Sequence, residues 1–126
     1  MIGIAINYLL KSSTALTALV GSKIFPFYVD EITSFPSVMY QVVSRIPTYV
    51  KDETIEETST VEIYSFSFTY LESLTVSNIV RSVLEFSHGS VQGIPIKQIR
   101  IEKIEENFDF DSNVFYSKIT FTIKTN

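Results

Sequence analysis

Few residues of this chain are placed to do acid–base or nucleophilic chemistry. The only histidine, His88, follows a helical pattern, where an imidazolium gains modestly from the helix dipole. No nucleophile is evident for it to activate, so we interpret His88 as a structural residue rather than a catalytic base. The chain has no cysteine, which excludes disulfide bonds and thiolate metal sites.

One polar run resembles the start of a calcium-binding loop. Residues 109–113 read D-x-D-x-N, but Val114 stands where that loop needs glycine and Thr120 where it needs a bidentate glutamate. Two further carboxylates, Glu105 and Glu106, are adjacent in a strand pattern and therefore point to opposite faces of a sheet. We predict a polar β-turn at 109–113 and no carboxylate pair for acid–base catalysis.

The common enzyme signatures are also absent from the sequence. It contains no P-loop, GxGxxG, GxSxG or HExxH motif, and its four glycines are widely separated. The net charge of −4, without a Lys/Arg cluster longer than a dipeptide, argues against a general nucleic-acid binder. The residues themselves therefore show no sign of an active site, and we expect no cofactor, no metal site and no sequence-specific nucleic-acid partner.

The elements that would have to position any site centre on one strand and the helix that follows it. From Thr60 to Tyr70 the side chains alternate with a period of two, which predicts a strand. One face carries Val61, Ile63, Ser65, Ser67 and Thr69, and the other carries Glu62, Tyr64, Phe66, Phe68 and Tyr70. From Val76 to Leu84 the apolar residues recur at i, i+3, i+4, i+7 and i+8, which predicts a helix with one apolar stripe.

Two helices are predicted at the start of the chain. The apolar residues 2–10 lack a preceding basic region and reach only about half of the ~20 residues that a membrane span needs, so we interpret them as a core helix. Ser12 or Ser13 can cap a short second helix, and Gly21 stands where a left-handed residue would end it.

The next segment is extended and interrupted by prolines. Residues 24–29 contain Pro26, which predicts an edge strand or an irregular crossing segment. Residues 30–35 are predicted to form a loop, and the alternation of residues 37–45 predicts a strand. We expect Pro47 to end that strand.

Residues 48–57 are predicted to form a long acidic hairpin loop. It is longer than the usual two to five residues of a hairpin connection, so it is either a solvated tip or a partner-binding arm. We take the arm as the candidate site. Its candidate contact residues are Tyr49, Lys51, Asp52, Glu53, Ile55, Glu56 and Glu57.

Two more strands close the chain. Gly89 is placed to end the preceding helix in a left-handed conformation. Residues 96–106 alternate with one slip, which a bulge near Lys97 or Gln98 would explain, and residues 114–124 alternate regularly. These two segments predict a second hairpin.

The elements follow the order α-α-(β)-β-β-α-β-β, which predicts an α+β fold. We expect a mainly antiparallel four-stranded sheet of two hairpins with the helices packed on one face, in a single domain over residues 1–126. A composition of 45% hydrophobic and 19% charged residues excludes a disordered chain. Helices can cover only one sheet face, so the other is either solvated or shielded by association with another subunit.

Short motifs in a fixed order carry a resemblance to a known family. Residues 16–21 (LTALVG) and 23–26 (KIFP) are close to the pattern ALVG-x-[RK]-I-[YF]-P, and residues 35–40 (FPSVMY) are similar to a P-x-[VI]-x-Y strand. The strand, amphipathic helix and final hairpin then follow in the same order. The chain thus resembles the small tail-completion proteins of long-tailed bacteriophages and prophages, also called tail terminators or tail-to-head joining proteins.

The resemblance implies a non-enzymatic structural protein of the virion, located at the neck or top of the tail and assembled in the host cytoplasm. Subunits of such families form a ring, commonly a hexamer, that caps the tail tube, stops its growth and joins it to the head connector. The implied partners are other copies of the chain, the tail tube protein and head-connector or neck proteins, with no membrane. In such a ring we expect the acidic loop to project toward the tube or the lumen.

A different class of function is the alternative. A small cytoplasmic α+β domain that binds a ligand or acts as an enzyme, as a monomer or a dimer, predicts a discrete pocket with convergent polar groups and no large oligomer.

Overall fold

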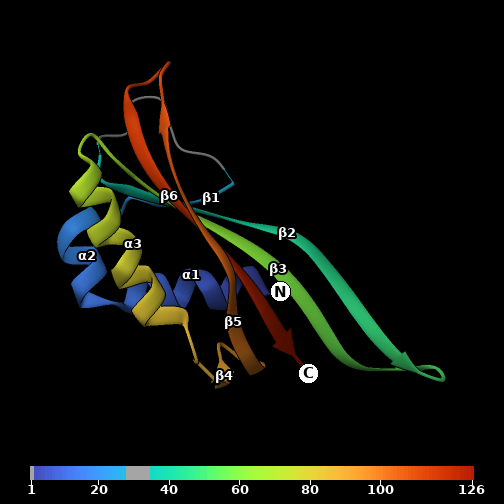
Figure 1. The fold of residues 1–126 in the computed structure, drawn as a ribbon. Helices are drawn as coiled ribbons and strands as arrows, with labels where there is room; N and C mark the ends of the chain where they lie inside the picture. Colours follow the sequence, from blue (N-terminus) through green and yellow to red (C-terminus); the bar gives the residue numbers. More distant parts are fainter. Residues whose placement is uncertain (1, 28–34) are drawn as a thin grey trace.

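The computed structural model describes residues 2–27 and 35–126, which form three helices and six strands (Figure 1). The α+β class predicted from the sequence is confirmed. In chain order the elements are α1 (Ile2–Ser12), α2 (Thr14–Val20), β1 (Ile24–Pro26), β2 (Ser37–Val50), β3 (Glu53–Ser67), α3 (Tyr70–Leu84), β4 (Gly89–Val91), β5 (Ile94–Asp109) and β6 (Val114–Thr125).

The strands form one sheet in the order β1-β2-β3-β6-β5-β4. β1 runs parallel to β2, and the other neighbours are antiparallel. The two expected hairpins, β2–β3 and β5–β6, meet along β3 and β6. The predicted four-stranded antiparallel sheet was wrong in strand number, because β1 and β4 have three residues each and are too short to show an alternation. β1 does lie at the sheet edge, as its Pro26 indicated.

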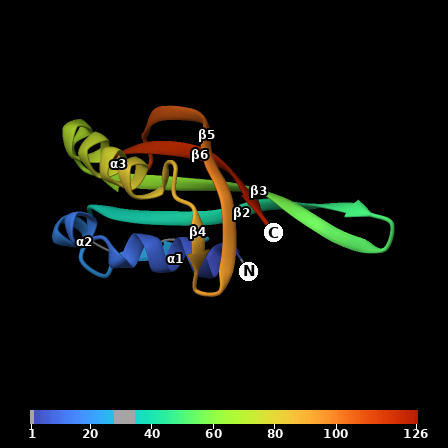
Figure 2. The same cartoon turned by 90° about the horizontal axis from the view of Figure 1, so that it is seen from below.

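One face of the sheet packs against the helices and holds the core. Val61 and Ile63 of β3 and Phe121 of β6 are fully buried there, together with Ile6 of α1 and Val80 of α3. The apolar stripe predicted for α1 is the face that this helix buries. α3 buries Val76, Val80 and Leu84 of its predicted stripe, together with Ser73 and Ser77, which the pattern did not place there. All three helices lie at one end of the molecule, and the β2–β3 hairpin extends away from them at the other (Figures 1 and 2).

Small side chains let α3 lie close to the sheet. Ser65 and Ser67 of β3 and Ser117 of β6 are buried beneath it, facing the buried Ser73 and Ser77 of the helix. The Ser117 hydroxyl donates a hydrogen bond to the Ser77 hydroxyl at 3.0 Å. Pairing these hydroxyls satisfies polar atoms that would otherwise be buried without a partner.

The helix ends follow the sequence signals in one case and depart from them in another. Ser13 caps α2 by accepting a hydrogen bond from the Leu16 N–H at 3.2 Å, and Gly21 ends that helix with a φ of 61°, both as predicted. α3 instead ends at a left-handed Phe86, with a φ of 67°, and Gly89 lies in β4. The prediction that Gly89 ends this helix was wrong, since nothing in the sequence marks a phenylalanine for that conformation.

The bulge expected in the second hairpin is present. The register of β5 against β6 shifts between Ile96 and Gln98, and a second shift, not predicted, lies between Ile101 and Lys103. The extended segment expected over 24–29 is present as β1 over Ile24–Pro26, and its last two residues lie outside the described part of the chain. The loop expected over 30–35 lies outside it except for Phe35.

No single helix among the described residues is long and apolar enough to cross a membrane. Taken together, α1 and α2 have the length and apolar composition of a membrane span, but they are bent by 80° to each other.

Candidate functional site

The predicted acidic loop is a β-hairpin arm rather than a loop. β2 continues through Pro47 to Val50, and β3 begins at Glu53, which leaves Lys51 and Asp52 as the connecting turn. The expectation that Pro47 ends the strand was wrong. β1 pairs with only three residues of β2, so beyond them the outer side of β2 is an open edge, where proline is tolerated.

We call residues 46–57 the arm. β6 pairs with β3 only as far as the Glu57–Thr125 pair, so the arm beyond Glu57 consists of two strands and a turn (Figure 1). All seven candidate contact residues predicted from the sequence lie in it. Tyr49 is on β2, Lys51 and Asp52 form the turn, and Glu53, Ile55, Glu56 and Glu57 are on β3.

The arm exposes large apolar side chains along its length. Ile46 is 62% exposed, Tyr49 63%, Val50 51% and Ile55 45%. A two-stranded ribbon gains little stability by itself, and apolar side chains grouped on it indicate a surface that contacts another molecule. The sequence drew attention to the acidic residues of this segment, but its exposed apolar side chains are the ones that would gain from a partner.

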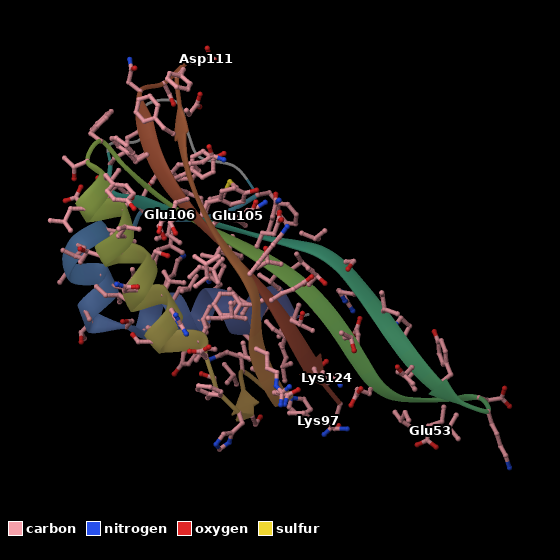
Figure 3. The ribbon with its side chains drawn as sticks, in the orientation of Figure 1. Glu53, Lys97, Glu105, Glu106, Asp111 and Lys124 are labelled. Atoms are coloured by element: carbon pink, nitrogen blue, oxygen red, sulfur yellow. The ribbon has the colours of Figure 1, made fainter. Side chains whose placement is uncertain are left out.

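Two ion pairs hold the base of the arm. Arg45 Nε lies 2.7 Å from Glu57 Oε1, and Lys97 Nζ of β5 lies 3.2 Å from Glu56 Oε2. The hydrogen bond and charge of Glu57 raise the pKa of Arg45 above its usual range. Both glutamates are thus engaged within the chain. The acidic residues toward the tip are Asp52 and Glu53, both exposed (Figure 3).

The sheet face opposite the helices, which we call the open face, carries a network of charges. Glu62 accepts a hydrogen bond from the Gln41 amide at 2.7 Å and pairs with Lys118 at 3.3 Å. Lys118 also pairs with Glu105 at 3.2 Å, and its ammonium lies 5.8 Å from the centre of the Tyr64 ring. Burial opposes ionisation of Glu62, but the bonds from Gln41 and Lys118 prevail and lower its pKa. The hydrogen bond to Glu105 raises the pKa of Lys118 despite partial desolvation.

An aromatic cluster adjoins this network on the open face. Tyr64 stacks on Phe66 with ring centroids 5.9 Å apart, and Tyr116 lies 5.8 Å from Phe66. Phe35 covers the end of the cluster, 6.0 Å from Phe66. The open face is therefore half-buried by its own side chains. Its charged groups Glu62, Glu105 and Lys118 pair with one another, whereas the buried Thr120 hydroxyl opposite Glu62 has no hydrogen-bond partner among the described residues. Whether another subunit also covers it stays a prediction.

An open groove of about 660 Å³ lies between α1, β1 and β2. On its floor the Tyr40 hydroxyl donates a hydrogen bond to Asn7 Oδ1 at 3.0 Å. Burial raises the pKa of Tyr40 above its usual value. The lining residues are Ile2, Gly3, Ile4, Asn7, Lys11, Pro26, Phe27, Tyr40, Val42 and Arg45. The groove could not be predicted from the sequence, because its lining comes from three segments that are distant along the chain.

The polar turn and the histidine weighed in the sequence lie in different places, and the turn adjoins Phe35 and Phe66 of the aromatic cluster. Asp109 accepts hydrogen bonds from the Asp111 N–H at 3.0 Å and the Ser112 hydroxyl at 2.9 Å, so its carboxylate shapes the β5–β6 turn. His88 is exposed between α3 and β4. Among the described residues, no three His, Cys, Asp or Glu side chains are grouped to hold a metal ion.

Comparison with known proteins found a matching family and solved structures with the same fold. A family model described as "Tail completion protein gp17" matches residues 4–126. One of the solved structures with the same fold is a chain of the "Virion of native gene transfer agent (GTA) particle", with a TM-score of 0.77 and 10% sequence identity. The match covers 95% of this chain and 90% of that one. No curated protein matches the sequence.

Proposed function

Because this chain belongs to the family of tail completion protein gp17, a family of structural bacteriophage proteins, we propose that it is a ring subunit that closes the tail tube and joins it to the head connector. The ring is most simply a hexamer. Its partners are other copies of the chain, the tail tube protein and a head-connector or neck protein. It acts at the neck of the virion and assembles in the host cytoplasm.

The observation that carries this proposal is the arm. A contact surface that projects beyond the packed body of the subunit suits a protein that works by fitting against other subunits (Figure 1). The apolar side chains of the arm have no cover within the described residues, so the isolated chain leaves them in water. Assembly would bury this apolar surface, and the free energy gained is about 25 cal/mol per Å² of apolar surface removed from water.

The sheet edges favour a ring over a symmetric dimer. β2 has an open edge beyond its three residues paired with β1, and β5 has one beyond its three residues paired with β4. These edges lie at opposite sides of the sheet and differ in sequence, so a contact between them would be head-to-tail. A head-to-tail contact repeated around a closing rotation gives a ring.

The solved structure with the same fold supports a virion location, because it is part of a gene transfer agent virion. We propose the same kind of location for this chain. The open face and the groove offer further surfaces to partners in such a particle.

A complementation experiment tests the function. A phage or prophage that lacks this gene is supplied with the natural chain, or with a variant in which Asn-Gly replaces residues 49–55. Thr48 and Glu56 are partners across the hairpin, and Asn-Gly favours a two-residue turn, so the variant shortens the arm and leaves its base paired. Electron microscopy measures tail length and the fraction of tails joined to heads. Leu71→Ser, at an exposed position of α3 far from the arm in sequence, is the matched control.

We expect overlong or unjoined tails without the gene, rescue by the natural chain and by Leu71→Ser, and no rescue by the shortened arm. Tails of normal length joined to heads without the gene would refute the proposed function. Full rescue by the shortened arm would leave the function in place and reject the arm as its contact surface.

A further inference from the structure

The arm and the groove have complementary shapes and chemistry, and we propose that in the ring the arm of one subunit lies in the groove of the next. This inference rests on the proposed ring and names the occupant of both surfaces. The arm contributes the exposed side chains of Ile46, Tyr49, Val50 and Ile55, which no other part of the described chain covers. The groove contributes a mostly apolar channel beside the open edge of β2.

The groove has the lining that such a ribbon requires. Ile4 and Phe27 are 50% and 61% exposed on its walls, although both are large apolar side chains. On the floor the Tyr40 hydroxyl donates to Asn7 Oδ1, and an apolar occupant would leave that hydrogen bond intact. The amide N–H groups of Asn7 would need an acceptor from the occupant, such as a backbone carbonyl of the arm. At about 660 Å³ the groove can take several side chains, such as Tyr49 together with other apolar residues of the arm.

Charges at the two surfaces also match. Lys11 and Arg45 are the charged residues of the groove lining, and no acidic residue is among them. The tip of the arm carries the exposed Lys51, Asp52 and Glu53, so its net charge is −1. When the arm enters the groove, these carboxylates are able to meet Lys11, while Arg45 keeps its own partner at the base of the arm. Such pairs contribute more to the choice and orientation of the partner than to raw affinity.

The occupant must come from a second copy, because the arm leads away from its own groove. Arg45 lines the groove, and Asp52 lies seven residues further along the hairpin, roughly 23 Å away at about 3.3 Å per residue. Figures 1 and 2 show the hairpin running away from α1 rather than folding back along it. Arm and groove are different surfaces, so their contact is head-to-tail, as a ring needs.

Disulfide trapping tests this contact, and the natural chain offers a clean background because it has no cysteine. The double variant Ile4→Cys/Tyr49→Cys joins groove and arm, and a second double variant, Lys11→Cys/Asp52→Cys, joins rim and tip. Each is produced with the tail tube protein of the same genome, tails are purified, and the thiols are oxidised. The products are separated by electrophoresis with and without reductant. The four single variants are the controls.

We expect at least one double variant to give a ladder of dimer, trimer and higher species that ends at a closed ring, whereas single variants give dimers at most. A monomer whose two thiols have formed an internal disulfide would show that the arm folds onto its own groove and would overturn the proposal. Cross-links only to the tube protein would overturn it in favour of the tube as the occupant. Particles in which neither double variant cross-links would also overturn it, while normal tails in those particles would leave the proposed function standing.

A second measurement does not depend on disulfide geometry. Ile4→Asp in the groove and Tyr49→Asp in the arm each place a carboxylate in the proposed contact, while Leu71→Asp places one at an exposed position of α3. We expect the first two to lower the yield of joined particles at least tenfold and the third to change it less than twofold. Circular dichroism checks that all three fold. Equal yields from all three variants would contradict the contact.

Discussion

The hydroxyl pair between α3 and the sheet gives the sharpest test of how this fold is held together. Ser77 and Ser117 are 4% and 1% exposed, and one hydrogen bond of 3.0 Å joins their oxygens. Ser77→Ala leaves the Ser117 hydroxyl buried without its partner, and Ser117→Ala does the same to Ser77. Each single change should therefore destabilise the fold by about 1–3 kcal/mol.

The double variant separates the hydrogen bond from the packing. Replacing both serines removes both polar atoms and nearly preserves the shape, so we expect a cost of about 0–1 kcal/mol, less than the sum of the single changes. The coupling energy should then be at least about 1 kcal/mol, in the range found for residues in direct contact. Urea unfolding followed by circular dichroism measures these free energies, and an unchanged m value shows that they compare the same transition.

Ser37 provides the matched control for this cycle. It is also fully buried, but its hydroxyl has no hydrogen-bond partner among the described residues. Ser37→Ala should therefore leave the free energy of unfolding unchanged or raise it. If Ser77→Ala and Ser117→Ala instead prove additive and no costlier than Ser37→Ala, the hydroxyl pair does not hold α3 on the sheet, and the reasoning fails.

Three further changes test other parts of the structure. Glu62→Gln should remove a contribution to stability that is present above the unfolded pKa of about 4.3 and lost as pH falls through the lowered folded pKa. Unfolding at pH 3 to 7 should therefore show natural chain and variant converging toward acid. Phe86→Gly should relieve a left-handed conformation of an exposed side chain and raise the unfolding free energy by about 0.5–1 kcal/mol in urea. Phe121→Ala should empty the largest fully buried position and cost about 3–5 kcal/mol, and a loss below 1 kcal/mol would contradict the core assignment.

The packed half of the fold could be predicted from the sequence because each element there has one solvent-exposed face and one buried face. The alternation around Val61 and Ile63 and the stripe from Val76 to Leu84 record that difference residue by residue. The slip in β5 marked a real bulge, at Ile96–Gln98, for the same reason. Short strands such as β4 leave too few residues for a period to appear.

The arm could not be predicted as strand because both of its faces are exposed. Every residue from Arg45 to Ile55 is exposed, so no alternation of burial constrains the sequence there. Its proline and acidic residues then resemble those of a loop. The groove could not be predicted from the sequence for another reason. Ile4, Phe27 and Val42 meet through tertiary packing, and the spacing of residues along the chain does not encode such a meeting.

The structure changes which surface should drive assembly. From the sequence, the sheet face away from the helices was expected to be either solvated or shielded by another subunit, and the structure shows that it is the aromatic face of β3. In the folded chain Glu62 and Lys118 of that face already pair with each other. Covering them would desolvate ion pairs that are already satisfied, a cost that often cancels the gain. The arm carries no such cost at Ile46, Val50 and Ile55, because these side chains are apolar and already in water. The free energy of association should therefore come mainly from the arm, and substitutions there should weaken assembly more than equal changes on the open face.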